Sequence, residues 1–295
     1  MTLPRQVLPG QFYMLTRRCS QRQFLLRPDK ETNNAFVYCL AEAAQRFEIE
    51  LIAAQQMSNH HHVTLFDRFG RVIEFTAHFH KMLAKCQNAL RGRWENMWSS
   101  EPPCLVELVD RSDVIDKTLY VALNPVLDHL VDRVAHWPGA KTVRAMLAQE
   151  PLEAVRPAHF FRDAGVMPAS ARLRFTIPEE LGGASSVLDE IRARIEAVEC
   201  ALDGERARTG MRVVGRRQVL RQSWRDSPTS REPRRELRPR VAARSKWSRI
   251  ETLCRNHAFQ RAYRVARAAW MRKQPIPFPA GTYWMARFVG VPVAA

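Results

Sequence analysis

The sequence predicts an α+β fold in which helices cover an antiparallel sheet. The first observation is the order of patterns along residues 1–150, which run strand, helix, strand, strand, helix, strand and helix. The second is that the two consecutive strands are joined by turn-forming residues, as in an antiparallel hairpin. The third is a hydrophobic content of 46%, which is enough to build a core in a chain of 295 residues.

The first half of this region supplies three strands and one helix. Residues 11–17 are a short β-rich run after a Pro-Gly turn signal, which predicts the first strand. Residues 29–48 place Phe36 and Leu40 at helical spacing, which predicts an amphipathic helix. Residues 48–56 and 60–70 are extended runs separated by Ser58 and Asn59, and they are expected to form a hairpin.

The second half adds a helix, a strand and a further helix. Periodic apolar residues predict a helix over residues 72–90, and LVELV at 105–109 is typical of a strand. Ser112 is expected to cap the next helix, because Asp113 and Asp116 then lie in its positive first turn. This helix ends no later than Trp137, which precedes a Pro-Gly pair.

Beyond residue 150 the pattern is less regular. Residues 186–202 are expected to form a helix, residues 210–240 a loop or extended arm, and residues 241–272 a final helix. We therefore expect three parts: a first domain at 1–150, a connector at 151–205, and a basic, mainly helical extension at 206–295.

The net charge lies almost entirely in this extension. Residues 1–200 carry 24 basic and 24 acidic side chains, whereas residues 201–295 carry 22 basic and 6 acidic ones and supply the whole net charge of +16. Such a segment favours a polyanion, either nucleic acid or an anionic membrane surface, because binding releases condensed counterions.

Membrane and secretory signals are lacking in the sequence. No apolar run approaches the roughly 20 residues that span a bilayer, and the first ten residues lack the apolar stretch of a secretory signal. We expect a cytoplasmic protein associated with the nucleoid. The cysteines form no C-x-x-C pair and are expected to be small buried hydrophobic residues. They are Cys19, Cys39, Cys86, Cys104, Cys200 and Cys254.

Three consecutive histidines in a predicted strand are the first chemical signal. Side chains alternate along a strand, so His60 and His62 share one face while His61 lies on the other. Two imidazoles one pleat apart suit a divalent ion that takes a third ligand from elsewhere. A polar strand with solvated histidines is the alternative.

A second His-x-His pair is a weaker signal. His78 and His80 lie in the predicted helix 72–90, where residues two apart point about 200° from each other. They cannot share one metal ion, and we expect ordinary histidines of a helix surface.

A tyrosine and an amide share one stripe of the following helix. Tyr120 and Asn124 are four residues apart, with Asp116 one turn earlier, so all three face the same way. Pro125 disfavours helical geometry at Asn124 and could kink the helix there. Alone, such a tyrosine more often packs at the edge of a core.

Together these segments resemble the HUH single-tyrosine transposases, especially the REP-associated tyrosine transposases. MSNHHHVTLF at 57–66 is similar to the histidine strand motif of that family, and YVALNPV at 120–126 to its tyrosine helix. The opening PGQFYMLTRR is also similar, and the resemblance covers residues 3–135. Ser58 and His61 depart from the family's usual proline and hydrophobic residue, and RWENMWSSEPP matches poorly the family's region before its fourth strand.

The resemblance implies a ferredoxin-like sheet sandwiched by helices, the HUH nuclease fold, for residues 1–150. It implies that His60, His62 and Asn124 hold Mg²⁺ or Mn²⁺, and that Tyr120 attacks a DNA phosphate to give a 5′-phosphotyrosine. The partner would be single-stranded or hairpin DNA, including REP-like palindromes, and the protein could form a homodimer. A catalytically silent hairpin-binding regulator and an HUH replication or mobilisation initiator are the alternatives.

Basic residues of the extension are expected to bind the DNA backbone. An alternative is a solvated arm that leads to a helical core. The candidate residues are Arg212, Arg216, Arg217, Arg221, Arg234, Arg235, Arg244 and Lys246.

Overall fold

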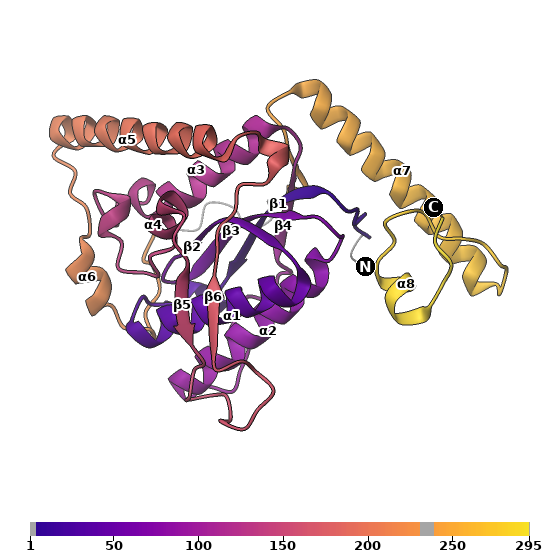
Figure 1. Ribbon diagram of the computed structural model, residues 1–295, viewed down its shortest axis with the longest axis horizontal. Coiled ribbons are helices and arrows are strands. Elements are labelled where there is room, and N and C mark those ends of the chain that lie inside the picture. Colours follow the sequence, from indigo (N-terminus) through magenta and orange to yellow (C-terminus); the bar gives the residue numbers. More distant parts are fainter. Residues whose placement is uncertain (1–3, 231–238, 295) are drawn as a thin grey trace.

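A mixed five-stranded sheet with helices on both faces forms the centre of the protein (Figure 1). The structure is a computed structural model, and it describes residues 4–230 and 239–294. The strand order is β2-β3-β1-β4-β7. The strands are β1 (Gln11–Arg18), β2 (Glu50–Gln56), β3 (His60–Asp67), β4 (Cys104–Leu108) and β7 (Val241–Ala242).

The predicted order of strands and helices is confirmed as far as Leu127, but a further helix at Thr142–Ala148, within residues 1–150, was not predicted. The helices up to Leu127 are α1 (Lys30–Phe47), α2 (Val72–Arg91) and α3 (Arg111–Leu127). Asp29 caps α1 by accepting a hydrogen bond from the backbone N–H of Thr32 (2.9 Å). Helix α3 begins at Arg111, one residue before the Ser112 that was expected to cap it, and it continues through Pro125 to Leu127.

The expectation of a purely antiparallel sheet is wrong at one edge. Strands β1, β2, β3 and β4 pair antiparallel, but β7 pairs in parallel with β4. Strand β7 comes from the basic extension and has only two residues, too few for a recognisable period in the sequence. The first and last parts of the chain therefore share one sheet.

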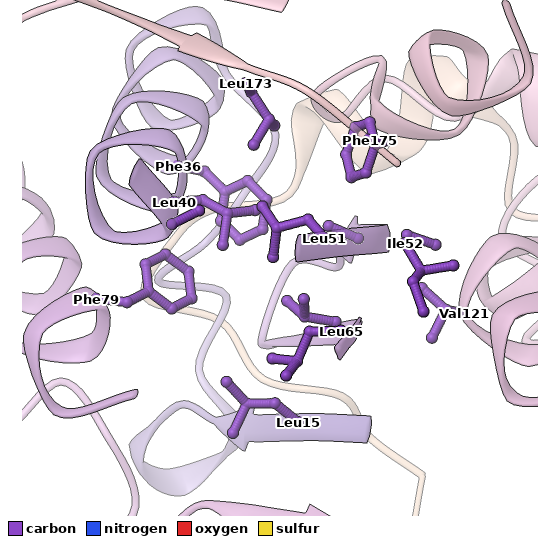
Figure 2. Packing of buried hydrophobic residues seen from close by; sticks show 14 of the residues in the cluster. Leu15, Phe36, Leu40, Leu51, Ile52, Leu65, Phe79, Val121, Leu173 and Phe175 are labelled. Atoms are coloured by element: carbon purple, nitrogen blue, oxygen red, sulfur yellow. The ribbon is translucent and has the colours of Figure 1, made fainter. Parts of the chain in front are cut away.

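The two faces of the sheet pack against different helices. Leu15, Leu51 and Leu65 point towards Phe36 and Phe79, which come from α1 and α2 (Figure 2). Ile52, on the other face of β2, lies near Val121 of α3 (Figure 2). Alternate residues of each strand are thus buried on opposite sides, and α3 covers the face that His60 and His62 share.

The remaining elements surround this sandwich. A small antiparallel sheet of β5 and β6 packs against α1. Helix α5 packs along α3, whereas α7 projects away from the sheet (Figure 1). These elements are α4 (Thr142–Ala148), β5 (Leu152–Val155), β6 (Ser170–Leu173), α5 (Ala184–Thr209), α6 (Arg216–Arg221), α7 (Lys246–Met271) and α8 (Trp284–Val289). Single 3₁₀ turns cover Ser20–Arg22, Val134–His136 and Glu179–Leu181.

Several sequence expectations for the second half need correction. The segment expected to be a loop contains α6, whose Val219 is buried beside Val126 and Trp137. The final helix begins at Lys246, because residues 241–242 belong to the sheet. Cys200 and Cys254 are exposed, although the other cysteines are buried or partly buried. In the described part of the chain, no helix has the length and apolar character needed to cross a membrane.

Candidate active site

The histidine strand and the tyrosine helix meet in one cleft. The His60 and His62 rings lie with their centroids 4.8 Å apart, and the Tyr120 ring lies 5.3 Å from that of His62. Asn124 is one turn beyond Tyr120, and its Oδ1 is 3.2 Å from Nε2 of His60. The packing of α3 across β3 thus brings His60 and His62 together with Tyr120 and Asn124, which lie about 60 positions later in the sequence.

The protonation of His60 follows from its neighbours. The side-chain N–H of Asn59 donates to the carbonyl oxygen of Arg22 (3.2 Å), so its Oδ1 faces Nδ1 of His60 at 2.7 Å. That oxygen can only accept, and therefore Nδ1 carries the proton and Nε2 has a free lone pair. The lone pair points at Oδ1 of Asn124, another acceptor. Two acceptors facing each other fit a cation between them.

His62 offers a second free nitrogen. Its Nδ1 lies 2.7 Å from the hydroxyl oxygen of Thr16, whereas its Nε2 is buried and has no hydrogen-bond partner. A buried nitrogen without a partner costs free energy unless a ligand satisfies it. The donors present, two imidazole nitrogens and an amide oxygen, therefore fit a divalent metal ion, with Asn59 and Thr16 orienting the two rings.

The charge state of the histidines is also suited to metal binding. Burial lowers the pKa of His60 to about 4, with Arg18 and Arg22 lowering it further and the contact with Asn124 opposing them. Burial, together with the neighbouring His60 and His61, holds the pKa of His62 well below its usual value. Both rings are therefore neutral at pH 7 and can donate a lone pair to a cation. Among the described residues, no three His, Cys, Asp or Glu side chains cluster as a metal site, so a metal ion held here would need a ligand of another type, such as the amide oxygen of Asn124.

Tyr120 is partly accessible and protonated at neutral pH. Its side chain is 40% exposed and lines the cleft. Burial and the nearby Asp128 raise its pKa, while its hydrogen bond with Asn124 lowers it. A phenol of this kind needs neighbouring positive charge to become an effective nucleophile.

Lys117 is a residue of this site that the sequence reasoning missed. It lies one turn before Tyr120 on α3, and its ammonium is 5.8 Å from the centre of the phenol ring. No ion pair of Lys117 is found within the described ranges, whereas Asp116 beside it pairs with Arg194 (2.7 Å) and Arg244 (3.6 Å). The stripe Lys117, Tyr120, Asn124 could have been found from helical spacing. The expectation that Asp116 faces the same way as Tyr120 and Asn124 is wrong, because its carboxylate pairs with these arginines and does not line the cleft.

The cleft has a volume of about 1390 Å³ and a wall that the sequence did not predict. Gln222 and residues 225–230 of the extension line it. The segment is fixed by backbone contacts: Phe24 N–H donates to the carbonyl of Asp226 (2.9 Å), and Arg27 donates to that of Gln222 (3.1 Å). No sequence signal links these residues to the histidines.

The other histidines have different environments. His61 is fully buried on the opposite face of β3, as predicted, with its Nε2 2.9 Å from Nε2 of His80. The expectation that His80 lies on a helix surface is wrong, because it is 3% exposed and contacts both His61 and Trp98. His78 points away from it and pairs with Glu42 (2.6 Å), so the two cannot share a metal ion.

The basic candidates are exposed and lie at both ends of α3. Val214 and Gly215 lie just before α6, and their backbone N–H groups donate to carbonyl oxygens just beyond the end of α3. At the other end, the backbone N–H of Arg244 donates to Asp113 (2.7 Å). Arg212, Arg216, Arg217, Arg221, Arg244 and Lys246 are all exposed. Arg234 and Arg235 lie outside the described residues.

Comparisons with known proteins give structural neighbours only. No protein-family model matches the chain, and no curated protein is similar to it in sequence. A REP-associated tyrosine transposase solved with a REP hairpin is 16% identical, and the match covers 59% of this chain and 98% of that one with a TM-score of 0.42. A candidate transposase from Deinococcus radiodurans R1 is also 16% identical, covering 40% and 93% of the two chains with a TM-score of 0.30. The chain is thus similar in outline to two proteins described as transposases.

Proposed function

We propose that this protein is a transposase-like enzyme with an HUH-type nuclease domain, which cleaves and rejoins single-stranded or hairpin DNA through Tyr120. One observation carries the proposal: a half-exposed phenol lies beside two neutral imidazoles whose free nitrogens face a cleft and an amide oxygen. The cleft is also bordered by cationic side chains, among them Arg18, Arg22 and Lys117, which suit a phosphate backbone.

The metal would be held by His60, His62 and the side-chain oxygen of Asn124. When bound, Mg²⁺ or Mn²⁺ supplies positive charge that neutralises the charge developing on a phosphate. Asn59 and Thr16 fix the orientation of the two imidazoles towards this position.

The covalent step uses the phenol of Tyr120 as nucleophile. Its oxygen attacks the phosphorus, the bond to the 3′ oxygen breaks, and the phenol proton passes to solvent while the 3′ oxygen takes up one proton. The products are a 5′-phosphotyrosine and a free 3′-hydroxyl. Because the ester bond is conserved, a second 3′-hydroxyl can reverse the step and rejoin a strand without ATP.

A covalent-adduct assay tests this function. Hairpin DNA labelled at its 3′ end is incubated with Mn²⁺, because the 3′ fragment is the one that stays on the protein. We expect a labelled adduct with the wild type, none with Tyr120→Phe, and an unchanged amount with the matched control Tyr263→Phe, because Tyr263 lies on α7 and its ring packs against Phe278.

Three outcomes would contradict the proposal in whole or in part. If the wild type binds hairpins but forms no adduct on any hairpin or single-stranded DNA, the protein is a silent binder. If Tyr120→Phe still forms the adduct, another nucleophile is used. Adduct formation that persists in EDTA would remove the metal from the proposal.

The exposed arginines of α6 are proposed to bind the DNA backbone beside the cleft. Replacing Arg216, Arg217 and Arg221 together by Glu should weaken binding and lower the slope of log Kd against log salt by about 0.7–0.9 per lost phosphate contact. These side chains are exposed, so the fold should be retained. An unchanged salt slope would exclude α6 from the DNA-binding surface.

A further inference from the structure

An almost fully exposed tryptophan lies near the candidate active site. Trp94 is 90% exposed, although indole is among the largest apolar side chains. It lies between α2 and β4, in the region that resembles the transposase family least. An exposed indole offers a flat face on which an unpaired base can stack.

The loop that carries Trp94 is held in place. Gly92 ends α2 in the left-handed conformation (φ 61°), and the backbone N–H of Arg93 donates to the carbonyl of Asn88 (2.8 Å). The side chain of Asn88 in turn donates to the carbonyl of Glu95 (2.7 Å). The loop that carries the indole is therefore held in a fixed conformation by hydrogen bonds.

The segment facing this loop is strained. Gln21 and Arg22 both have positive φ values, 50° and 57°, which residues with a Cβ rarely adopt, least of all in succession. Strain of this kind has a conformational cost and is concentrated at ligand-binding segments. The backbone N–H of Ser20 donates to the carbonyl of Met97 (2.8 Å), which ties this segment to the Trp94 loop.

A polar hollow of about 490 Å³ lies between the two segments. Its lining residues include Trp94, three residues with side-chain amides, and Arg93, whose Nε is buried without a hydrogen-bond partner. Amides present donors and acceptors side by side, as the edge of a nucleobase does. The lining residues are Ser20, Gln21, Gln23, Arg93, Trp94, Glu95 and Asn96.

The hollow and the cleft share one wall. Arg22 lines the cleft, whereas Gln21 and Gln23 on either side of it line the hollow. A nucleic acid strand that leaves the cleft past the guanidinium of Arg22 would therefore reach Trp94 within a short length of chain.

We infer that the hollow beside Trp94 binds an unpaired nucleobase from the single-stranded segment next to the cleaved phosphate. The base stacks on the indole, the amides of Gln21, Gln23 and Asn96 meet its edge, and Arg22 contacts the backbone between the two sites. This inference rests on the proposed function, since it needs DNA in the cleft. The Trp94 loop would select DNA in which an unpaired strand lies at a fixed distance from Tyr120.

Binding measurements on full-length protein test the site. A fluorescent hairpin with a single-stranded flank is titrated with wild type, Trp94→Ala, Trp94→Phe and Phe69→Ala. The last is a matched control, because Phe69 is a 51% exposed aromatic just beyond the far end of β3 from His60. We expect Trp94→Ala to raise Kd by about 5- to 150-fold, the range of one base stacked on an aromatic ring. Trp94→Phe should restore most of the affinity, and Phe69→Ala should bind like the wild type.

An abasic scan locates the bound base. Each nucleotide of the flank is replaced in turn by an abasic site, and Kd is measured with wild type and Trp94→Ala. One position should weaken the wild type but not the variant, because the same contact is already lost. Equal penalties in both proteins at every position, or a Trp94→Ala variant that binds like the wild type, would overturn the inference.

The adduct assay separates this failure from that of the proposed function. If the wild type forms the Tyr120 adduct while Trp94→Ala shows no binding defect, only the nucleobase site is wrong. If the wild type neither binds DNA nor forms the adduct, the proposed function fails and the nucleobase site fails with it.

Discussion

Histidines on the two faces of β3 lie in opposite environments. On one face, His60 and His62 line a cleft beside an accessible phenol, with Nε2 of His60 facing Asn124 and Nε2 of His62 without a hydrogen-bond partner. On the other, His61 is enclosed by Phe36, Phe79, Trp98 and His80 and has no access to solvent. The pleat of the strand places three identical side chains in a row on two faces, where different elements supply their neighbours. A histidine run indicates a reactive site only where the facing helix supplies partners.

The largest effect should come from removing a nitrogen on the cleft face. His62→Ala removes a proposed metal ligand and is expected to reduce Mn²⁺-dependent adduct formation by more than about 100-fold. Replacing a residue that only orients a ligand already reduces metal affinity or activity by about 10- to 100-fold. Hairpin affinity should stay within a few-fold of the wild type. Adduct formation near the wild-type rate would remove His62 from the site.

The next effect should appear on the buried face, in stability. His61→Ala leaves a cavity among aromatic rings and deprives His80 of its contact, so the free energy of unfolding should fall by about 2–4 kcal/mol in urea titrations. Adduct formation per folded molecule should change little. A variant as stable as the wild type, or one that is stable but inactive, would show that the two faces are not separate.

His80 should make the buried face sensitive to acid. Burial, with further contributions from His61 and Arg17, holds its pKa well below 6.5 in the folded protein. The unfolded chain therefore takes up a proton first as the pH falls, and stability present above pH 6.5 is lost below it. His80→Gln should reduce the loss between pH 7 and pH 5 by about 1–2 kcal/mol, measured by urea unfolding at each pH. His78→Gln is the control, and equal loss in both variants would contradict this assignment.

The smallest effect should come from an orienting residue of the cleft face. Thr16→Val removes the hydroxyl beside Nδ1 of His62 and should weaken Mn²⁺ affinity by about tenfold, without loss of folding. Isothermal titration with Mn²⁺ measures this directly, and Thr76→Val, on α2, serves as the control. Identical affinities in the two variants would show that Thr16 does not position the ring.

Much of the fold and the core of the candidate site could be predicted from the sequence. The alternation of β3 predicted which two histidines share a face, and helical spacing predicted that Tyr120 and Asn124 face together. The local signals for these elements are strong, because each is a regular strand or helix with a buried face. The burial of His80 could not be predicted, since its partner His61 lies on another element and only packing joins them.

The contribution of the extension could not be predicted for a similar reason. Residues 222–230 and β7 are irregular or very short, and their positions are set by backbone hydrogen bonds to segments about 200 and 130 residues earlier. Trp94 could be read only as a mismatch to the family pattern. Its exposure and the strained turn beside it depend on tertiary structure.

The pairing of β7 with β4 also has a consequence for synthesis of the chain. The outer edge of β4 stays open until residues 241 and 242 have left the ribosome, more than 130 residues after β4 itself. An open edge next to a hydrophobic strand invites pairing with another chain. The edge thus stays open throughout this interval, and once the arginine-rich segment is made, like charges on neighbouring nascent chains would help to keep their edges apart.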